Sequence, residues 1–191
     1  MRKYILAALI AGSFAAPAMA QDSGRAPFTG VRVEGLLGWD RPQSGGDHRD
    51  GLLYGGGVGY DFQAGRAVLG LEGEASGSTA KDCVSNFAAA GDRLCTRTGR
   101  DLYVGGRVGA LVAPSTLLYA KAGYTNARVR ATYDLAGTTT RTGQNLDGFR
   151  VGGGVEQAVG SRSFVKVEYR YSNYEKDVDR HQVVAGVGFR F

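Results

Sequence analysis

The sequence predicts an all-β protein, an eight-stranded antiparallel up-and-down transmembrane β-barrel. Three observations lead to this fold class. Eight segments alternate apolar and polar residues with the period of two that is typical of half-apolar strands. The connectors between these segments alternate between short and long. No stretch after residue 20 has the apolar length of a membrane-spanning helix, whereas a spanning sheet needs no such stretch.

The first 20 residues have the features of a secretory signal peptide. Arg2 and Lys3 precede an apolar run, and residues 18–20 read AMA, the small-x-small pattern of a cleavage site. An uncleaved membrane anchor is the alternative, but the run is short for a span of about 20 residues. We therefore expect a cleaved signal at 1–20, a short segment at 21–27 and one barrel domain at 28–191.

The charge of the chain gives no indication of nucleic-acid binding. The formal net charge is +5, and the loss of Arg2 and Lys3 with the signal leaves 5 − 2 = +3. No basic cluster or basic helix follows the signal segment. We therefore expect no nucleic-acid partner.

Four alternating segments lie in the first part of the chain. In residues 28–40, Val31 and Trp39 share one face. Arg32 and Glu34 share the opposite face. The same pattern recurs in residues 51–62, 67–76 and 101–112. Each segment therefore predicts one strand with an apolar face and a polar face.

Four further segments follow the same period. They are residues 117–125, 148–156, 164–172 and 182–191. The last segment alternates through to Phe191, which has the same odd-or-even position in the strand as Phe189, its parity, and so lies on the same face. After residue 125 the phase slips near Asn126, which predicts a bulge or the edge of the membrane.

The connector lengths predict how the strands are joined. Three connectors are short, at residues 63–66, 113–116 and 157–163. Four are longer, at residues 41–50, 77–100, 126–147 and 173–180. Because short and long connectors alternate, all short turns fall at one end and all long loops at the other. Up-and-down barrels have this layout.

Aromatic residues are expected to mark the two membrane interfaces. One group lies at the strand ends beside the short turns: Phe28, Phe62, Phe164 and Phe191. A second group lies nearer the long loops: Trp39, Tyr54, Phe149 and Tyr171. Two rings around an aliphatic band match the headgroup levels of a bilayer. Ordinary core packing at strand ends is the alternative interpretation.

At this point the chain resembles a known family. The AMA-type signal and the segments LLYAKAGYT, KVEYRYS and GVGFRF are similar to those of small Gram-negative outer-membrane β-barrels. The nearest likeness is to porin-family barrels related to opacity proteins and outer-membrane immunogenic proteins. The OmpA/OmpX-type barrels are more distant relatives. The resemblance covers residues 28–191.

The resemblance implies a location and partners. It implies the cell outer membrane, contact with outer-membrane lipid and lipopolysaccharide, and passage through the barrel-assembly machinery. In that family the terminal strand is the signal that the machinery reads, which assigns this role to Phe189 and Phe191. It also implies a monomer with a structural, envelope-integrity or surface-interaction role of the antigen or adhesin kind.

The polar faces of the eight segments carry balanced charges. On this parity assignment seven cations and seven anions face the lumen. The cations are Arg32, Arg107, Lys121, Arg150, Lys166, Arg170 and Arg190. The anions are Glu34, Asp61, Glu72, Glu74, Asp101, Glu156 and Glu168. An eight-stranded barrel is just wide enough for side chains to fill it, so we expect paired charges in a filled lumen. A narrow porin that conducts ions or small solutes is the alternative.

Cys83 and Cys95 are the only cysteines, and both lie in the longest predicted loop. An even count in an exported protein suggests a disulfide. Two free thiols or a metal pair without histidine partners are the alternatives. Residues of the long loops such as Phe87, Arg93, Arg128 and Arg141 are candidates for contact with lipopolysaccharide phosphates or a host protein.

Two other classes of protein compete with this interpretation. Some outer-membrane barrels are enzymes and need a nucleophile with a positioned base, usually serine with histidine. Here His181 is followed by Gln182 and Val183, and GEASG at 73–77 does not have the GxSxG spacing. We therefore expect no catalysis, cofactor or metal. A soluble eight-stranded lipocalin is the second rival, but it leaves the terminal Phe191 and the aromatic rings unexplained.

Overall fold

The computed structural model describes residues 27–44, 47–48, 50–85, 92–135, 138–175 and 178–191. The expected signal at 1–20 and residues 21–26 of the segment after it lie outside the described residues, as does Phe87. Within the described ranges, no helix has the length and apolar character needed to cross a membrane.

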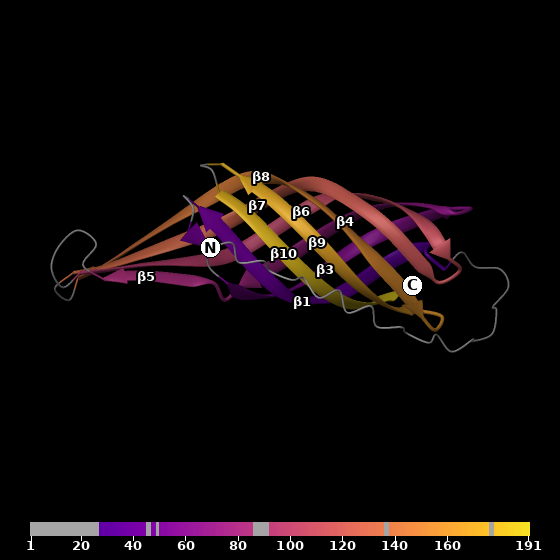
Figure 1. Ribbon diagram of the computed structural model, residues 1–191, viewed down its shortest axis with the longest axis horizontal. Coiled ribbons are helices and arrows are strands. Elements are labelled where there is room, and N and C mark those ends of the chain that lie inside the picture. The colour runs from indigo at the N-terminus through magenta and orange to yellow at the C-terminus, as the bar shows by residue number, and fades with distance from the viewer. Residues whose placement is uncertain (1–26, 45–46, 49, 86–91, 136–137, 176–177) are drawn as a thin grey trace, which may run out of the picture.

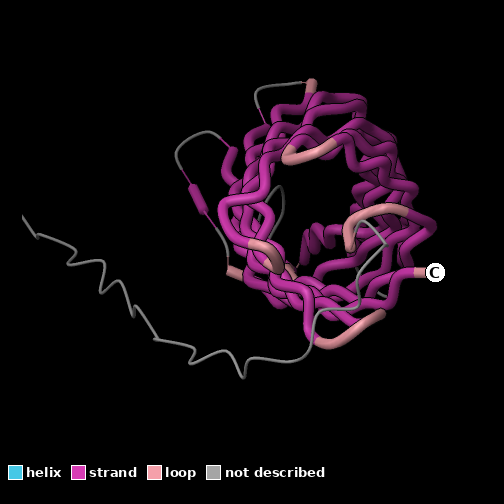
Figure 2. Tube along the Cα trace, turned by 90° about the vertical axis from the view of Figure 1, so that its right-hand side faces the viewer, coloured by secondary structure: helices cyan, strands magenta, loops and turns pink. Residues whose placement is uncertain are grey.

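Eight strands close into a ring, as Figure 2 shows in a view along the barrel. They are β1 (Gly30–Ser44), β3 (Gly51–Ala64), β4 (Ala67–Ser78), β6 (Arg93–Ala113), β7 (Thr116–Leu135), β8 (Thr138–Val159), β9 (Ser163–Tyr174) and β10 (Val178–Arg190). Each pairs antiparallel with its neighbour along the chain, and β1 pairs with β10 to close the ring. The short strands β2 (Asp47–His48) and β5 (Lys81–Ser85) pair with β1 and β6. The predicted up-and-down barrel is confirmed.

Closure satisfies the backbone of every wall strand. The seam aligns Arg32 with Arg190 and Trp39 with Val183, so the first and last strands hydrogen-bond along most of their length. A ring without an edge leaves no row of unpaired backbone groups, which lipid could not satisfy.

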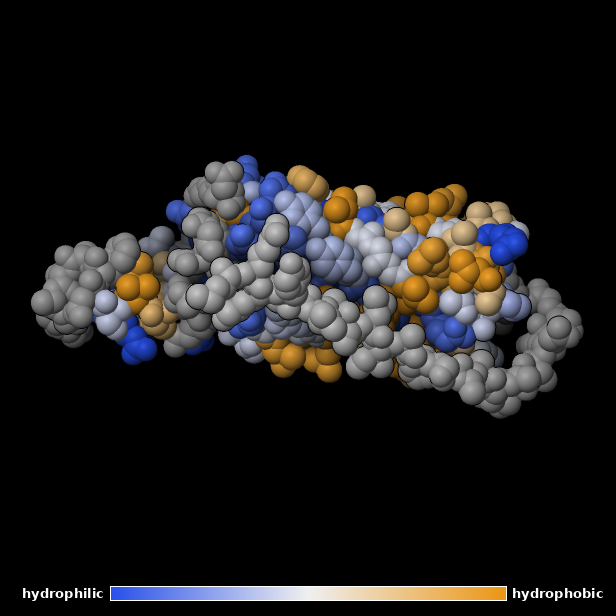
Figure 3. Space-filling model, in the orientation of Figure 1, coloured by the Kyte–Doolittle hydropathy of each residue, from blue (hydrophilic) through white to orange (hydrophobic). Residues whose placement is uncertain are grey.

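The period of two separates an apolar exterior from a polar interior. Outward residues such as Leu71, Val104 and Val167 are among the most exposed apolar side chains of the chain. The space-filling view shows orange apolar patches over the half of the barrel away from its extended end (Figure 3). An exterior rich in exposed apolar side chains around a charged interior is the inverse of a soluble barrel and matches a wall that faces lipid.

Three tight turns join strands at one end of the barrel. They lie at residues 65–66, 114–115 and 160–162. Gly65 and Gly160 have φ angles of 61° and 73°, the left-handed region that glycine enters without a Cβ clash. The predicted short connectors are therefore turns at one end, although each is shorter than expected.

The predicted long loops at 77–100 and 126–147 are instead largely strand. β6, β7 and β8 continue beyond the ring, and β5 pairs with β6 to form a four-stranded arm. We define the arm as residues 81–85, 93–100, 128–135 and 138–146; Figure 1 shows it extending to the left of the barrel. The prediction was wrong because the strands continue to pair beyond the point where their apolar face ends. In this part of the chain the alternation of apolar and polar residues no longer indicates a strand.

The expected bulge lies on the strand opposite Asn126. The pairing of β6 with β7 shifts between Thr98 and Asp101, so that Gly99 and Arg100 together oppose Arg128. β7 itself keeps its parity: Ala127 follows the inward Thr125 and packs in an apolar cluster. The apparent slip in the sequence therefore marks the change from a charged to an apolar interior.

Phe28 and Phe164 do not belong to the outer aromatic ring. Both are buried, at 0% and 1% exposure, and both rings lie 5.2 Å from the Arg190 guanidinium inside the barrel. Their parity is that of Arg32 and Lys166, which face the lumen. The exposed aromatics that remain near the short turns are Phe62 and Phe191, while Trp39, Tyr54 and Phe149 lie toward the arm.

Candidate functional site: the charged lumen and the arm

The structure places all fourteen predicted charges inside the barrel, together with Asp40 and Arg180. The described interior of the ring thus holds eight cations and eight anions, all buried. Burying an unpaired charge costs several kcal/mol or more, so balance alone is not enough and each charge needs a partner within contact distance. The ion pairs form three successive groups along the barrel.

The group nearest the short turns is centred on Asp61. Its carboxylate accepts hydrogen bonds from Nε and Nη2 of Arg107 at 2.8 and 2.6 Å and from Arg190 at 2.9 Å. Nε of Arg32 lies 3.1 Å from the same carboxylate. Glu156 accepts from Arg107 at 2.7 Å and from Arg190 at 2.8 Å. Two carboxylates therefore hold three guanidinium groups at this level.

The middle group surrounds Lys121. Its ammonium lies 2.6 Å from Glu72, 2.7 Å from Glu74 and 3.2 Å from Glu168. Arg170 donates to Glu74 at 2.9 Å and also to Glu168. Glu74 on β4 is thus shared between cations from β7 and β9, so its ion pairs link strands across the lumen.

Lys166 extends the middle group toward the barrel seam. Its ammonium donates to Glu34 at 2.7 Å, and Arg32 pairs with both Glu34, at 3.1 Å, and Glu72. The hydroxyl of Tyr119 donates to Glu168 at 2.6 Å. Neutral donors therefore satisfy carboxylate oxygens that cations leave open.

The group nearest the arm is centred on Asp101 and Asp40. Asp101 accepts from Arg150 and, at 2.8 Å, from Arg180. Arg180 also forms a bidentate pair with Asp40 at 2.6 and 2.7 Å, to which Gln182 adds a bond of 3.1 Å.

Sequence reasoning left Asp40 and Arg180 out of the predicted network. Arg180 fell in the predicted loop 173–180, yet it has the same parity as the inward Gln182 and Arg190. Asp40 has the same parity as Arg32 and Glu34. Asp40 already lies within the predicted segment 28–40, on its polar face, whereas Arg180 is found by extending the alternation of segment 182–191 by two residues.

Apolar side chains form three clusters inside the barrel, between and beyond the charges. Near the short turns, Phe28, Val68, Leu117 and Tyr119 form one cluster. Leu36, Leu53 and Val184 form a second cluster. Ala127, Leu146 and Tyr174 form a third at the base of the arm. In the described interior, apolar clusters therefore lie beside the ion pairs.

Glycines make room for the charged side chains. A Cβ added at Gly70 on β4 would lie 2.1 Å from Oδ1 of Asp61. A Cβ at Gly57 on β3 would lie 3.0 Å from Oε1 of Glu34. The glycine-rich inward faces thus allow long side chains from neighbouring strands to cross the lumen.

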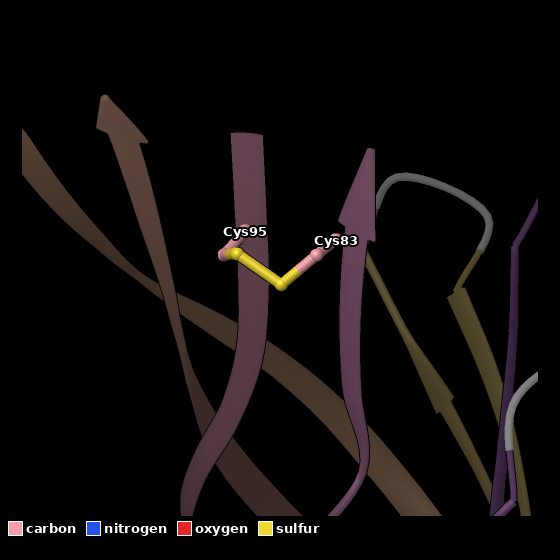
Figure 4. The surroundings of a disulfide bond; sticks show 2 residues. All are labelled: Cys83 and Cys95. Carbon is pink, nitrogen blue, oxygen red and sulfur yellow. A yellow bond between two sulfur atoms is a disulfide. The ribbon is translucent and has the colours of Figure 1, made fainter. Parts of the chain in front are cut away.

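A disulfide joins Cys83 on β5 to Cys95 on β6 (Figure 4). The two residues are direct cross-strand partners, so the bond ties β5 to the rest of the arm. Asp92, close to this bond, is buried and accepts a hydrogen bond of 2.8 Å from the Tyr133 hydroxyl, which raises the pKa of that phenol. The disulfide therefore fastens β5 to β6, and the hydrogen bond joins the start of β6 to β7.

The other predicted surface residues lie outside the lumen. Arg93, Arg128 and Arg141 are exposed on the arm. Phe189 and Phe191 point outward and are 55% and 72% exposed. Among the described residues, no group of three or more histidine, cysteine or acidic side chains has a metal-binding arrangement.

The sequence and fold define an outer-membrane barrel, and comparison with known proteins agrees. Residues 6–191 match the family described as outer membrane protein beta-barrel domain. The chain belongs to this family, and the protein resides in the Gram-negative outer membrane.

Two sequence relatives carry matching descriptions. The chain is 27% identical over 174 residues to the 25 kDa outer-membrane immunogenic protein of Brucella ovis, covering 86% of this chain and 76% of that protein. It is 31% identical over 165 residues to the 22 kDa outer membrane protein of Rhizobium leguminosarum bv. viciae, covering 76% and 70%. The predicted likeness to immunogenic outer-membrane proteins is confirmed.

Solved structures share the fold. The attachment invasion locus protein Ail of Yersinia pestis, in complex with the heparin analogue sucrose octasulfate, superposes with a TM-score of 0.59 at 13% identity, covering 85% of this chain and 99% of that chain. Neisserial surface protein A superposes with a TM-score of 0.55 at 18% identity, covering 85% and 98%.

Proposed function

We propose that the protein is a closed, non-catalytic wall protein of the outer membrane whose specific role resides in the arm. That role is structural, in envelope integrity, or an interaction at the cell surface. The single observation that carries this proposal is the interior, where sixteen buried charges pair with one another and apolar clusters lie beside them. The arm provides exposed polar surface beyond the apolar band for such a role.

The relatives support a surface role without specifying a ligand. The Brucella relative is described as immunogenic, which fits display at the cell surface. An ion-conducting narrow porin remains the alternative function, since the same charges would line its path.

The proposed orientation is tested by labelling intact cells. We expect a cysteine introduced at Thr140, exposed near the end of the arm, to react with a membrane-impermeant maleimide. A cysteine at Ser161, exposed in the turn between β8 and β9, should react only after the outer membrane is permeabilised. Labelling of Ser161→Cys but not Thr140→Cys on intact cells would reverse the orientation.

The proposed role is tested by deletion and complementation. We expect a strain lacking the protein to show increased sensitivity to detergent or reduced adhesion. The wild-type gene should restore normal behaviour to the deletion strain. A variant in which the arm is replaced by short turns should not restore it. Full complementation by the armless barrel contradicts a role in the arm.

We also propose that Phe189 and Phe191 guide assembly of the barrel. Phe189 lies on the lipid side of β10, the strand that closes the ring against β1, and Phe191 directly follows it, with its backbone N–H donating to the carbonyl of Val31. Phe191→Ala should lower the amount of heat-modifiable, folded protein in the outer membrane. The matched control is Phe62→Ala, which removes an equally outward phenyl ring from β3. Equal yields for the two variants would remove the assembly role.

A further inference from the structure

Three arginines gather in an open groove where the arm leaves the barrel. The groove measures about 670 Å³ and lies between the outer ends of β3 and β4 on one side and β6 and β7 on the other. Arg97, Arg100 and Arg130 line it, together with Tyr54 and Ala75. The groove is distinct from the lumen network, because all three arginines are exposed side chains.

The β6 bulge creates this arrangement. In a regular strand, side chains three residues apart point to opposite faces, so Arg97 and Arg100 would lie on opposite sides of β6. Because Gly99 and Arg100 together oppose the single residue Arg128, the parity of β6 shifts by one and both arginines line the same groove. A Cβ at Gly99 would lie 2.6 Å from the carbonyl oxygen of Arg128, so this position favours glycine.

The arginines repel one another, and the described carboxylates are paired elsewhere. Arg97 and Arg130 are direct cross-strand partners, and like charges in that position are destabilising. The described carboxylates at this end of the barrel pair with other cations: Asp40 with Arg180, Asp50 with Arg41, and Asp101 with Arg150 and Arg180. A bound anion would supply a counterion, and arginine is suited to phosphate because its donors match the geometry of the oxygens.

The opposite wall of the groove faces lipid. Tyr54 and Ala75 are outward residues, and Tyr54 belongs to the aromatics at the arm end of the apolar band. Further along β4, β6 and β7, the same outer face has an apolar hollow of about 630 Å³ lined by Leu71, Gly106 and Ala122, among others. The groove therefore combines an anion site at headgroup level with an apolar surface below it.

We propose that this groove binds the phosphorylated headgroup of a glycolipid in the surrounding leaflet. Its phosphates contact Arg97, Arg100 and Arg130, and an acyl chain lies against Tyr54 and Ala75. The apolar wall favours a membrane-anchored lipid over a soluble polyanion, which has no group to place there. The lipid's position in the outer leaflet rests on the proposed orientation of the arm, but the binding site itself does not.

The test uses full-length protein in detergent and native mass spectrometry, with diphosphorylated lipid A as the probe. We expect the triple variant R97Q/R100Q/R130Q to bind about tenfold or more weakly than the wild type, because it loses charge-assisted hydrogen bonds. The matched control R41Q/R66Q/R162Q removes three surface arginines that do not line the groove and should bind within about twofold of the wild type. Heat-modifiability establishes that both variants are folded.

Two further probes distinguish the chemistry. Dephosphorylated lipid A should bind the wild type no better than diphosphorylated lipid A binds the groove variant. Tyr54→Ala should weaken lipid A binding while leaving any binding of sucrose octasulfate unchanged. Equal losses in the two triple variants would overturn the proposal in favour of general electrostatic attraction. Binding of the soluble polyanion as tight as that of lipid A, with the same dependence on the groove arginines, would overturn the assignment to a lipid.

Discussion

Replacing Asp61 with alanine lowers the free energy of unfolding of the detergent-solubilised barrel by about 3 to 5 kcal/mol, the cost of leaving buried charges without their partner. Asp61 is fully buried and contacts Arg32, Arg107 and Arg190, each within 3.1 Å. Its removal leaves these guanidinium groups with Glu72, Glu34 and Glu156 as their remaining anionic partners. Urea titration followed by tryptophan fluorescence measures the change.

The matched control is Asp50→Ala. Asp50 pairs with Arg41 at 3.5 Å, but its side chain is 56% exposed, so its loss should cost about 0 to 1 kcal/mol. A water-filled lumen would hydrate the stranded arginines and make the two substitutions similar. Equal unfolding midpoints for Asp61→Ala and Asp50→Ala therefore contradict a filled interior.

Replacing Val58 with arginine should destabilise the barrel in lipid by about 2 to 4 kcal/mol, the cost of a cation at the middle of a bilayer. Val58 is an outward residue of β3, 59% exposed, four positions from both Tyr54 and Phe62. In a soluble barrel the same substitution on an exposed site would cost little. Unfolding measured in lipid vesicles therefore tests which solvent faces this surface.

Thr142→Arg provides the control for Val58→Arg. Thr142 is exposed on the arm and lies beyond the apolar band, so a cation there should leave stability nearly unchanged. If Val58→Arg is as stable in vesicles as Thr142→Arg, the outer face is not in contact with hydrocarbon.

The sequence was sufficient to predict the ring and most of its interior because both depend on one period. Each strand crosses the membrane with one face in lipid, so parity alone assigns Arg32 and Glu74 to the lumen and Leu71 and Val104 to the lipid. The same parity, applied to Phe28 and Phe164, would have placed them inside.

The arm and the groove could not be predicted from that period. Beyond the membrane both faces of a strand meet water, so polar residues occupy both faces and the alternation disappears. The β6 bulge is likewise a matter of register between β6 and β7, which no single strand's sequence specifies. The convergence of Arg97, Arg100 and Arg130 therefore became visible only once the strands were paired.

Planar-bilayer recording of the wild-type barrel tests the central claim most directly. An eight-stranded wall leaves room for little more than its own side chains, and here sixteen paired charges and apolar clusters occupy the described interior. We predict no stable conductance steps under an applied voltage. Steady single-channel currents whose ion selectivity shifts in Glu74→Gln or Arg107→Gln would contradict the closed lumen and show that these charges line a conducting path.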